Sequence, residues 1–284
     1  MEKPCTLLVH FDKGSPWMAS EIKADLEGSD VAAKADAMNC AIMLLLYGET
    51  LPHLFLTVVR YVLLSEDHTI KKLLLLYLEI VDRREPKSGR VLPEMILVVG
   101  LLRKNLQHPN EYIRGVTLRF LCRLSEPELL EPLVPSVAAN LDHRHPFVRR
   151  HAFSAVSAVY SLPHGGDLLL SGDAPDLVER AIAAEQDASA RRNAFVTLCA
   201  CARERAVAYL LANADRVAEW WPGLLQMAAV DLIRKVVCLS PSPDKGRFIK
   251  IIVSLLSAPS SAFVHESAGA LVSLSSAPTD KFLA

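Results

Sequence analysis

The chain has 284 residues, of which 51% are apolar and 22% charged, and its formal net charge is −1. This composition is typical of a packed protein, and only 12 glycines leave little room for the turns of an all-β fold. Because the net charge is close to zero, no general basic field exists to bind a phosphate backbone, and we do not expect nucleic acid as a partner.

The amino-terminal sequence lacks the basic start and apolar stretch of a secretory signal. No run of residues approaches the roughly 18 consecutive apolar residues that a membrane span needs. The six cysteines are scattered, without the regular spacing of a disulfide scaffold. We therefore expect a cytoplasmic protein with reduced thiols.

One pattern recurs along the chain: a polar turn, an apolar–basic pair, and then a helical stripe of apolar residues. The residues that align at the basic position are Lys34, Lys71, Arg114, Arg149, Arg191 and His265. Their intervals are 37, 43, 35, 42 and 74 residues, the last being twice 37 with a degenerate repeat near Ala228. A period near 40 is typical of HEAT and armadillo repeats. It predicts an all-α, HEAT/armadillo-like α-solenoid, a superhelix of stacked helix pairs.

Taken in chain order, the elements are helices separated by polar or Pro-rich breaks. We expect the breaks at 48–52, 85–93, 108–109, 125–135, 143–146, 163–175, 222–223, 240–246 and 258–261. Between them the apolar spacing is helical, as for Ile113, Val116, Phe120 and Leu124. About 13 or 14 helices and no sheet are expected. The unbroken repeat predicts one elongated domain over residues 1–284, with about seven repeats.

The helix expected at 94–105 is unusual because it has almost no polar face between Met95 and Leu102. A helix that is apolar all round needs burial on every side, whereas a solenoid helix normally keeps one flank in water. We therefore expect a partner to cover part of this helix.

Catalytic signatures are absent: the chain has no nucleophile elbow and no glycine-rich phosphate loop. His265 and Glu266 open like a zinc-protease helix but lack the second His four residues on. His108, His143 and His145 occupy equivalent turns of successive repeats, without nearby ligands of suitable spacing. We expect no enzymatic activity, no metal and no cofactor.

The recurring basic residues have a structural interpretation and a functional one. Arg114, Arg149 and Arg191 occupy the same repeat position, so we expect them to link neighbouring repeats through turn carboxylates such as Asp142 or Asp187. The alternative is that the basic positions contact a partner or an anionic membrane surface.

Several strings resemble, in the right order, the amino-terminal trunk of coatomer beta subunits, a family related to the large adaptins. They lie at 67–77, 106–124, 129–133, 142–150, 187–195 and 273–278. The resemblance covers essentially the whole chain and implies a structural subunit of a COPI-type coat. Such a subunit is peripheral on Golgi membranes, acts in Golgi–endoplasmic reticulum and intra-Golgi transport, and is recruited by a GTP-bound Arf-family GTPase. The resemblance also implies other coatomer subunits as partners, foremost a delta-type subunit.

The same resemblance implies that the GTPase contacts Ile96 and Val99, with Leu102 one turn further on. Full beta subunits continue through more trunk repeats, a linker and an appendage, which we expect to be absent from this chain. Two alternatives remain: a general HEAT/armadillo scaffold, such as a nuclear-transport-type cargo binder, and a non-functional truncated duplicate.

Overall fold

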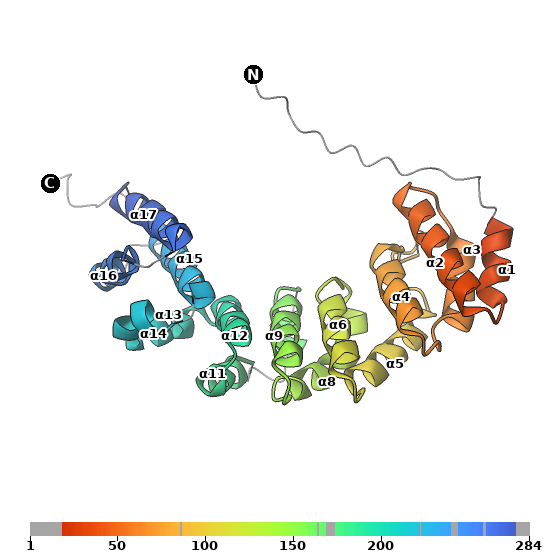
Figure 1. Ribbon diagram of the computed structural model, residues 1–284, viewed down its shortest axis with the longest axis horizontal. Helices are drawn as coiled ribbons and strands as arrows, with labels where there is room; N and C mark the ends of the chain where they lie inside the picture. Colours follow the sequence, from red (N-terminus) through yellow and green to blue (C-terminus); the bar gives the residue numbers. More distant parts are fainter. Residues whose placement is uncertain are drawn as a thin grey trace, which may run out of the picture. The chain divides into compact units, whose positions relative to one another are not determined.

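The computed structural model describes residues 19–85, 87–163, 165–168, 174–221, 223–239, 244–257 and 260–276. These residues form helices and no strand, apart from one isolated bridge between Arg84 and Val91 (Figure 1). The all-α prediction is therefore confirmed for this part of the chain. Parts of the predicted breaks at 85–93, 163–175, 222–223, 240–246 and 258–261 lie outside the described residues.

The chain divides into two compact units, one ending at Leu101 and the other beginning at Leu102. The single elongated domain expected from the repeat stays a prediction, and each unit is described by itself. The helices of the first unit are α1 (Ala19–Glu27), α2 (Val31–Leu46), α3 (Pro52–Tyr61), α4 (His68–Ile80) and the start of α5 (Met95–Leu106). Here α2 packs between α1 and α4, and α1 also packs on α3.

The second unit contains a row of long helices, each packed on the next along the row. They are α6 (Glu111–Leu121), α9 (Pro146–Tyr160), α12 (Ala188–Cys201), α15 (Gly223–Leu239) and α17 (Ser261–Ser276). Shorter elements pack beside them: α7 (Pro127–Leu130), η1 (Glu131–Leu133), α8 (Val134–Ala139), α10 (Gly165–Leu168), α11 (Ala174–Ala184), α13 (Arg203–Ala212), η3 (Ala214–Arg216), α14 (Val217–Trp220) and α16 (Lys245–Leu255). The described residues hold seventeen α-helices, more than the 13 or 14 expected, because 3₁₀ turns separate α7 from α8 and α13 from α14 and because α10 is an additional one-turn helix.

Five of the long helices begin in the same way. A polar side chain accepts a hydrogen bond from a backbone N–H of the first turn, where the helix itself provides no acceptor. These N-caps are Asp30, Asp67, Asn110, His145 and Asp187. The aligned basic residue lies four positions after each cap, and its backbone N–H closes the first turn onto the carbonyl of the cap. The repeat read from the sequence is thus a repeated helix start.

Three of these basic side chains, those of Lys34, Arg114 and Arg149, bind backbone carbonyls of neighbouring turns. Arg114 donates to the carbonyls of Gln107 and His108 just after α5, and to Asn140 Oδ1 in the turn after α8, at 3.1 Å. Lys34 donates to the carbonyl of Tyr61 at the end of α3, at 3.2 Å. These bonds satisfy carbonyl groups that helix ends and turns leave without intrahelical partners.

Arg149 makes the strongest of these connections. Its Nη1 donates to the carbonyls of His143 and Arg144, both at 2.8 Å, and its Nε and Nη2 bind the two oxygens of Glu185 at 2.6 and 2.7 Å. The expected carboxylates were the wrong ones: Asp187 caps α12 and Asp142 is exposed. Arg149 therefore joins the turn before α9 to the turn before α12.

Burial alone would raise the pKa of Glu185. The hydrogen bonds from Arg149 and from the backbone N–H of Asp187 outweigh that effect and hold the pKa below its ordinary value. The hydrogen bond with Glu185 in turn raises the pKa of Arg149. Because only 7% of Glu185 is exposed, the carboxylate depends on these partners for its solvation.

The stripe predicted between residues 113 and 124 lies largely in the core, and Phe120 on α6 is 1% exposed. Phe153 on α9 and Phe195 on α12, which belong to no predicted stripe, are fully buried as well. Close approach of α6 and α9 needs Gly115, because a Cβ there would lie 2.1 Å from the ring of Phe147. Neighbouring helices of this unit therefore interlock through aromatic side chains.

Replacing Phe120 with Ala should lower the free energy of unfolding by about 3–5 kcal/mol, because a large buried ring leaves a cavity. Leu64, which is 77% exposed, offers the matched control: Leu64→Ala should change that free energy by less than about 0.5 kcal/mol. Chemical denaturation of both variants measures the difference. Equal stabilities would place Phe120 on the surface.

Replacing Glu185 with Gln should lower the free energy of unfolding by about 3–5 kcal/mol at pH 7, because it leaves the Arg149 charge without its carboxylate. The pKa of Glu185 is depressed in the folded state, so its stabilisation is complete above its ordinary value of 4.5. The stabilisation is lost as pH falls through the lower folded-state pKa, and the two proteins should converge in acid.

The control is Arg144, whose side chain is 82% exposed and pairs with Glu111 at 2.6 Å. An exposed ion pair contributes about 0–1 kcal/mol, so Arg144→Ala should be nearly neutral. Denaturant melts at pH 7 and at successively lower pH measure both variants. A Glu185→Gln protein as stable as the Arg144→Ala protein would show that the buried pair is not structural.

Candidate functional site

The predicted GTPase-binding residues on α5 do not share one exposed surface. Ile96 is 74% exposed, but Val99 is 7% exposed and Leu102 is fully buried. The expectation that all three present apolar surface is therefore wrong for Val99 and Leu102. The reason is that periodicity cannot choose the exposed side of a helix that is apolar on every side.

The apolar surface that α5 does expose lies in its first turn. Ile96 is followed by Leu97, which is 55% exposed, while Met95 and Val98 are buried. Two adjacent large aliphatic side chains in water are a candidate contact for a partner. We call Ile96 and Leu97 the α5 apolar pair.

A cavity of about 530 Å³ lies in the same unit, and part of its lining comes from the segment that leads into α5. Its lining includes Phe55 and Leu56 of α3, Arg84 after α4, and Leu92 and Glu94 immediately before α5. Leu56 is about half exposed. The cavity therefore has both polar and apolar lining residues, and two of them, Leu92 and Glu94, lie a few residues before the α5 apolar pair in the chain.

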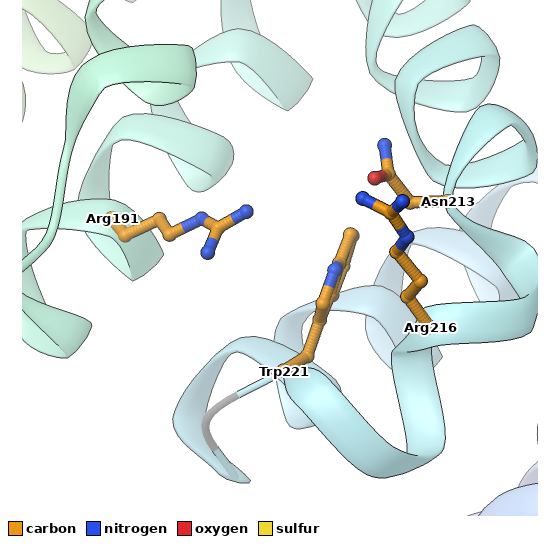
Figure 2. Close-up of a pocket in the computed structure, with 4 residues that line it drawn as sticks. All are labelled: Arg191, Asn213, Arg216 and Trp221. Atoms are coloured by element: carbon orange, nitrogen blue, oxygen red, sulfur yellow. The ribbon is translucent and has the colours of Figure 1, made fainter.

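A second cavity of about 530 Å³ lies in the second unit and is lined by Arg191, Asn213, Arg216 and Trp221 (Figure 2). Arg191 comes from the first turn of α12, and the other three come from the turns around η3 and α14. Two guanidinium groups, one amide and one indole therefore meet here. Sequence analysis singled out Arg191 alone, because no spacing rule links it to residues that follow α13.

The conspicuous histidines serve as acceptors in turns. His143 Nδ1 accepts from the backbone N–H of His145 at 3.1 Å, and His145 Nδ1 accepts from that of Phe147 at 3.2 Å. His108 Nδ1 accepts from the N–H of Asn110. Among the described residues, no group of three or more His, Cys, Asp or Glu side chains could hold a metal ion.

The cysteine side chains that the structure describes are free thiols. Burial raises the pKa of Cys199 to about 12 and that of Cys201 to about 11, so neither is an activated thiolate at neutral pH. Cys5 and the side chain of Cys238 lie outside the described residues. Within the described part of the chain, no helix is long and apolar enough to cross a membrane.

Comparison with known proteins identifies the family of this chain. The chain is 80% identical over 280 residues to coatomer subunit beta-1 of Oryza sativa subsp. japonica and 47% identical over 280 residues to coatomer subunit beta of Sus scrofa. These matches cover 98% of this chain, which spans 29% and 28% of the length of these relatives. The crystal structure of Kap121p is similar with a TM-score of 0.64 over 94% of this chain and 30% of that protein.

The identity to Kap121p is 14%, so this likeness shows the fold alone, and it confirms the helical solenoid class. The family model "Adaptin N terminal region" matches residues 17–283, and this match covers nearly the entire chain. The α-solenoid fold, its repeated helix starts and this match together establish that the chain belongs to the adaptin N-terminal family.

Proposed function

We propose that this chain is the amino-terminal trunk of a coatomer beta subunit and acts as a structural scaffold of a COPI-type vesicle coat. The observation that carries the proposal is 80% identity to a coatomer beta subunit across 98% of the chain. At this level of identity, about four in five of the aligned residues are the same in the two proteins. Among the described residues, no group of three or more His, Cys, Asp or Glu side chains could hold a catalytic metal ion.

In this role the chain is a cytoplasmic protein, peripheral on Golgi membranes, in Golgi–endoplasmic reticulum and intra-Golgi transport. Its partners are other coatomer subunits, foremost a delta-type subunit, and a GTP-bound Arf-family GTPase. The near-neutral net charge supports recruitment by a protein partner over recruitment by charge alone, since an anionic membrane attracts basic clusters.

The surface we propose for the GTPase is the α5 apolar pair. Aliphatic anchors that lose water at the centre of an interface commonly contribute most of the binding energy. Ile96 and Leu97 are large and exposed, which fits that role, whereas the buried Val99 and Leu102 support α5 from within the fold. Binding should depend on the GTP form, because only that form orders the switch loops of a GTPase.

Replacing Ile96 with Asp should weaken binding of the GTP-locked Arf-family GTPase at least about thirtyfold, which corresponds to about 2 kcal/mol. The melting temperature should not change, since Ile96 is 74% exposed. Pull-down and titration with the GTP-bound and GDP-bound GTPase measure the effect. Undiminished binding by a folded Ile96→Asp protein would place the contact elsewhere.

Two control variants separate surface effects from folding effects. Leu64→Asp changes an exposed leucine outside α5 and should leave GTPase binding intact. Val99→Asp places a charge at a buried position and should destabilise the fold strongly. A Val99→Asp protein as stable as wild type would show that Val99 faces solvent and that α5 is rotated about its axis.

A pull-down of the chain with the other coatomer subunits tests the scaffold role itself. We expect capture of a delta-type subunit, irrespective of the nucleotide on the GTPase. Failure to capture any coatomer subunit would reject the coat function.

A further inference from the structure

The arginine at the repeat position changes its partner along the second unit. Arg149 finds a bidentate carboxylate on Glu185, and Arg114 finds the amide of Asn140. Arg191 donates from Nη2 to the hydroxyl of Tyr209 at 3.2 Å, and its buried Nε has no hydrogen-bond partner among the described residues. Of these three arginines, Arg149 alone has a carboxylate partner among the described residues, and Arg191 alone keeps a buried N–H without a partner there.

The side chain of Arg191 faces the cavity that it lines with Asn213, Arg216 and Trp221 (Figure 2). Arg216 approaches from the opposite side and makes no ion pair with a described side chain. Asn213 donates from Nδ2 to the carbonyl of Tyr209 at 2.8 Å, which fixes its amide. Two guanidinium groups therefore line one hollow, and an anion bound there interacts favourably with both.

The wall of the cavity is rigid and aromatic. Trp221 is 5% exposed and packs against Phe195 and Tyr209, with ring centroids 5.7 and 5.9 Å away. The hydroxyl of Tyr209 is the same group that holds Arg191. The cluster therefore fixes the direction of one guanidinium and offers an apolar surface beside it, so little ordering is needed when an anion binds.

We propose that this cavity binds an acidic side chain, Glu or Asp, of a partner protein, in place of the carboxylate that Glu185 provides to Arg149. Planar guanidinium groups match carboxylates through paired hydrogen bonds, and the indole accommodates the carbon stem of the acidic residue. A volume of about 530 Å³ accepts a side chain with its flanking backbone. The recessed indole and the presence of two arginines among the described lining residues, rather than a broad basic cluster, favour a peptide over a membrane surface. Such binding does not require the coat role.

The test uses the whole chain and two blocked peptides, Ac-Ala-Glu-Ala-amide and Ac-Ala-Gln-Ala-amide, followed through the indole N–H resonance of Trp221. The Glu peptide should shift this resonance saturably, with a Kd at least about tenfold lower than that of the Gln peptide. Arg191→Gln and Arg216→Gln should each weaken binding of the Glu peptide at least about tenfold.

Arg192→Gln is the matched control, because Arg192 is exposed next to Arg191 and its guanidinium donates to the neighbouring Asn193 at 3.0 Å, outside the cavity lining. It should leave peptide binding unchanged. Arg216 is exposed, so Arg216→Gln keeps the test valid even if Arg191→Gln unfolds.

Three results would overturn the proposal: equal affinity for the Gln peptide, a Glu-peptide affinity that Arg216→Gln does not change, or tighter binding of inorganic phosphate than of the Glu peptide. Vesicles of anionic lipid form a further arm. Competition by these vesicles, stronger than that of the Glu peptide, would assign the cavity to a headgroup and reject a protein carboxylate.

Discussion

One interaction links neighbouring turns of the second unit: an arginine four positions after a helix cap binds backbone carbonyls, as Arg114 and Arg149 do. Arg149 shows its full form: the guanidinium spans the turn before α9 and the carboxylate of Glu185 before α12. A solenoid has only nearest-neighbour contacts, so each interface must fix its own geometry. Apolar stripes supply most of the burial, and a directional ion pair adds a defined geometry between the turns that it joins.

Much of this fold could be predicted from the sequence because each repeat begins with the same short series of residues. A cap such as Asn110 or Asp187, a basic residue four positions later and a helical stripe all lie within a single helix. Partner choice was less predictable. Asp187 looked like the ion-pair carboxylate, but it is engaged as a cap, and Glu185, which lies just before it, takes the pair. Only the path of the turn decides between them.

The candidate sites could be predicted only in part from the sequence. The apolar character of α5 predicted a partner, yet the exposed pair is Ile96 and Leu97, and Val99 is buried. Packing chooses the face when every face is apolar. The Arg191 cavity needs Trp221 and Arg216, which approach through η3 and the turns beside it, and no spacing rule predicts that they meet. The arginine at the repeat position thus serves the scaffold at Arg149, where it pairs with Glu185, and lines the proposed binding cavity at Arg191.

A double-mutant cycle on Arg149 and Glu185 tests most directly whether the buried ion pair organises adjacent repeats. The free energies of unfolding of wild type, Arg149→Met, Glu185→Gln and the double variant give the coupling between the two side chains. We expect a coupling of at least about 1.5 kcal/mol at pH 7, so the double variant should lose less stability than the two single variants lose together. A coupling near zero would contradict this role of the ion pair, and would leave the apolar stripes alone to set the spacing of the repeats.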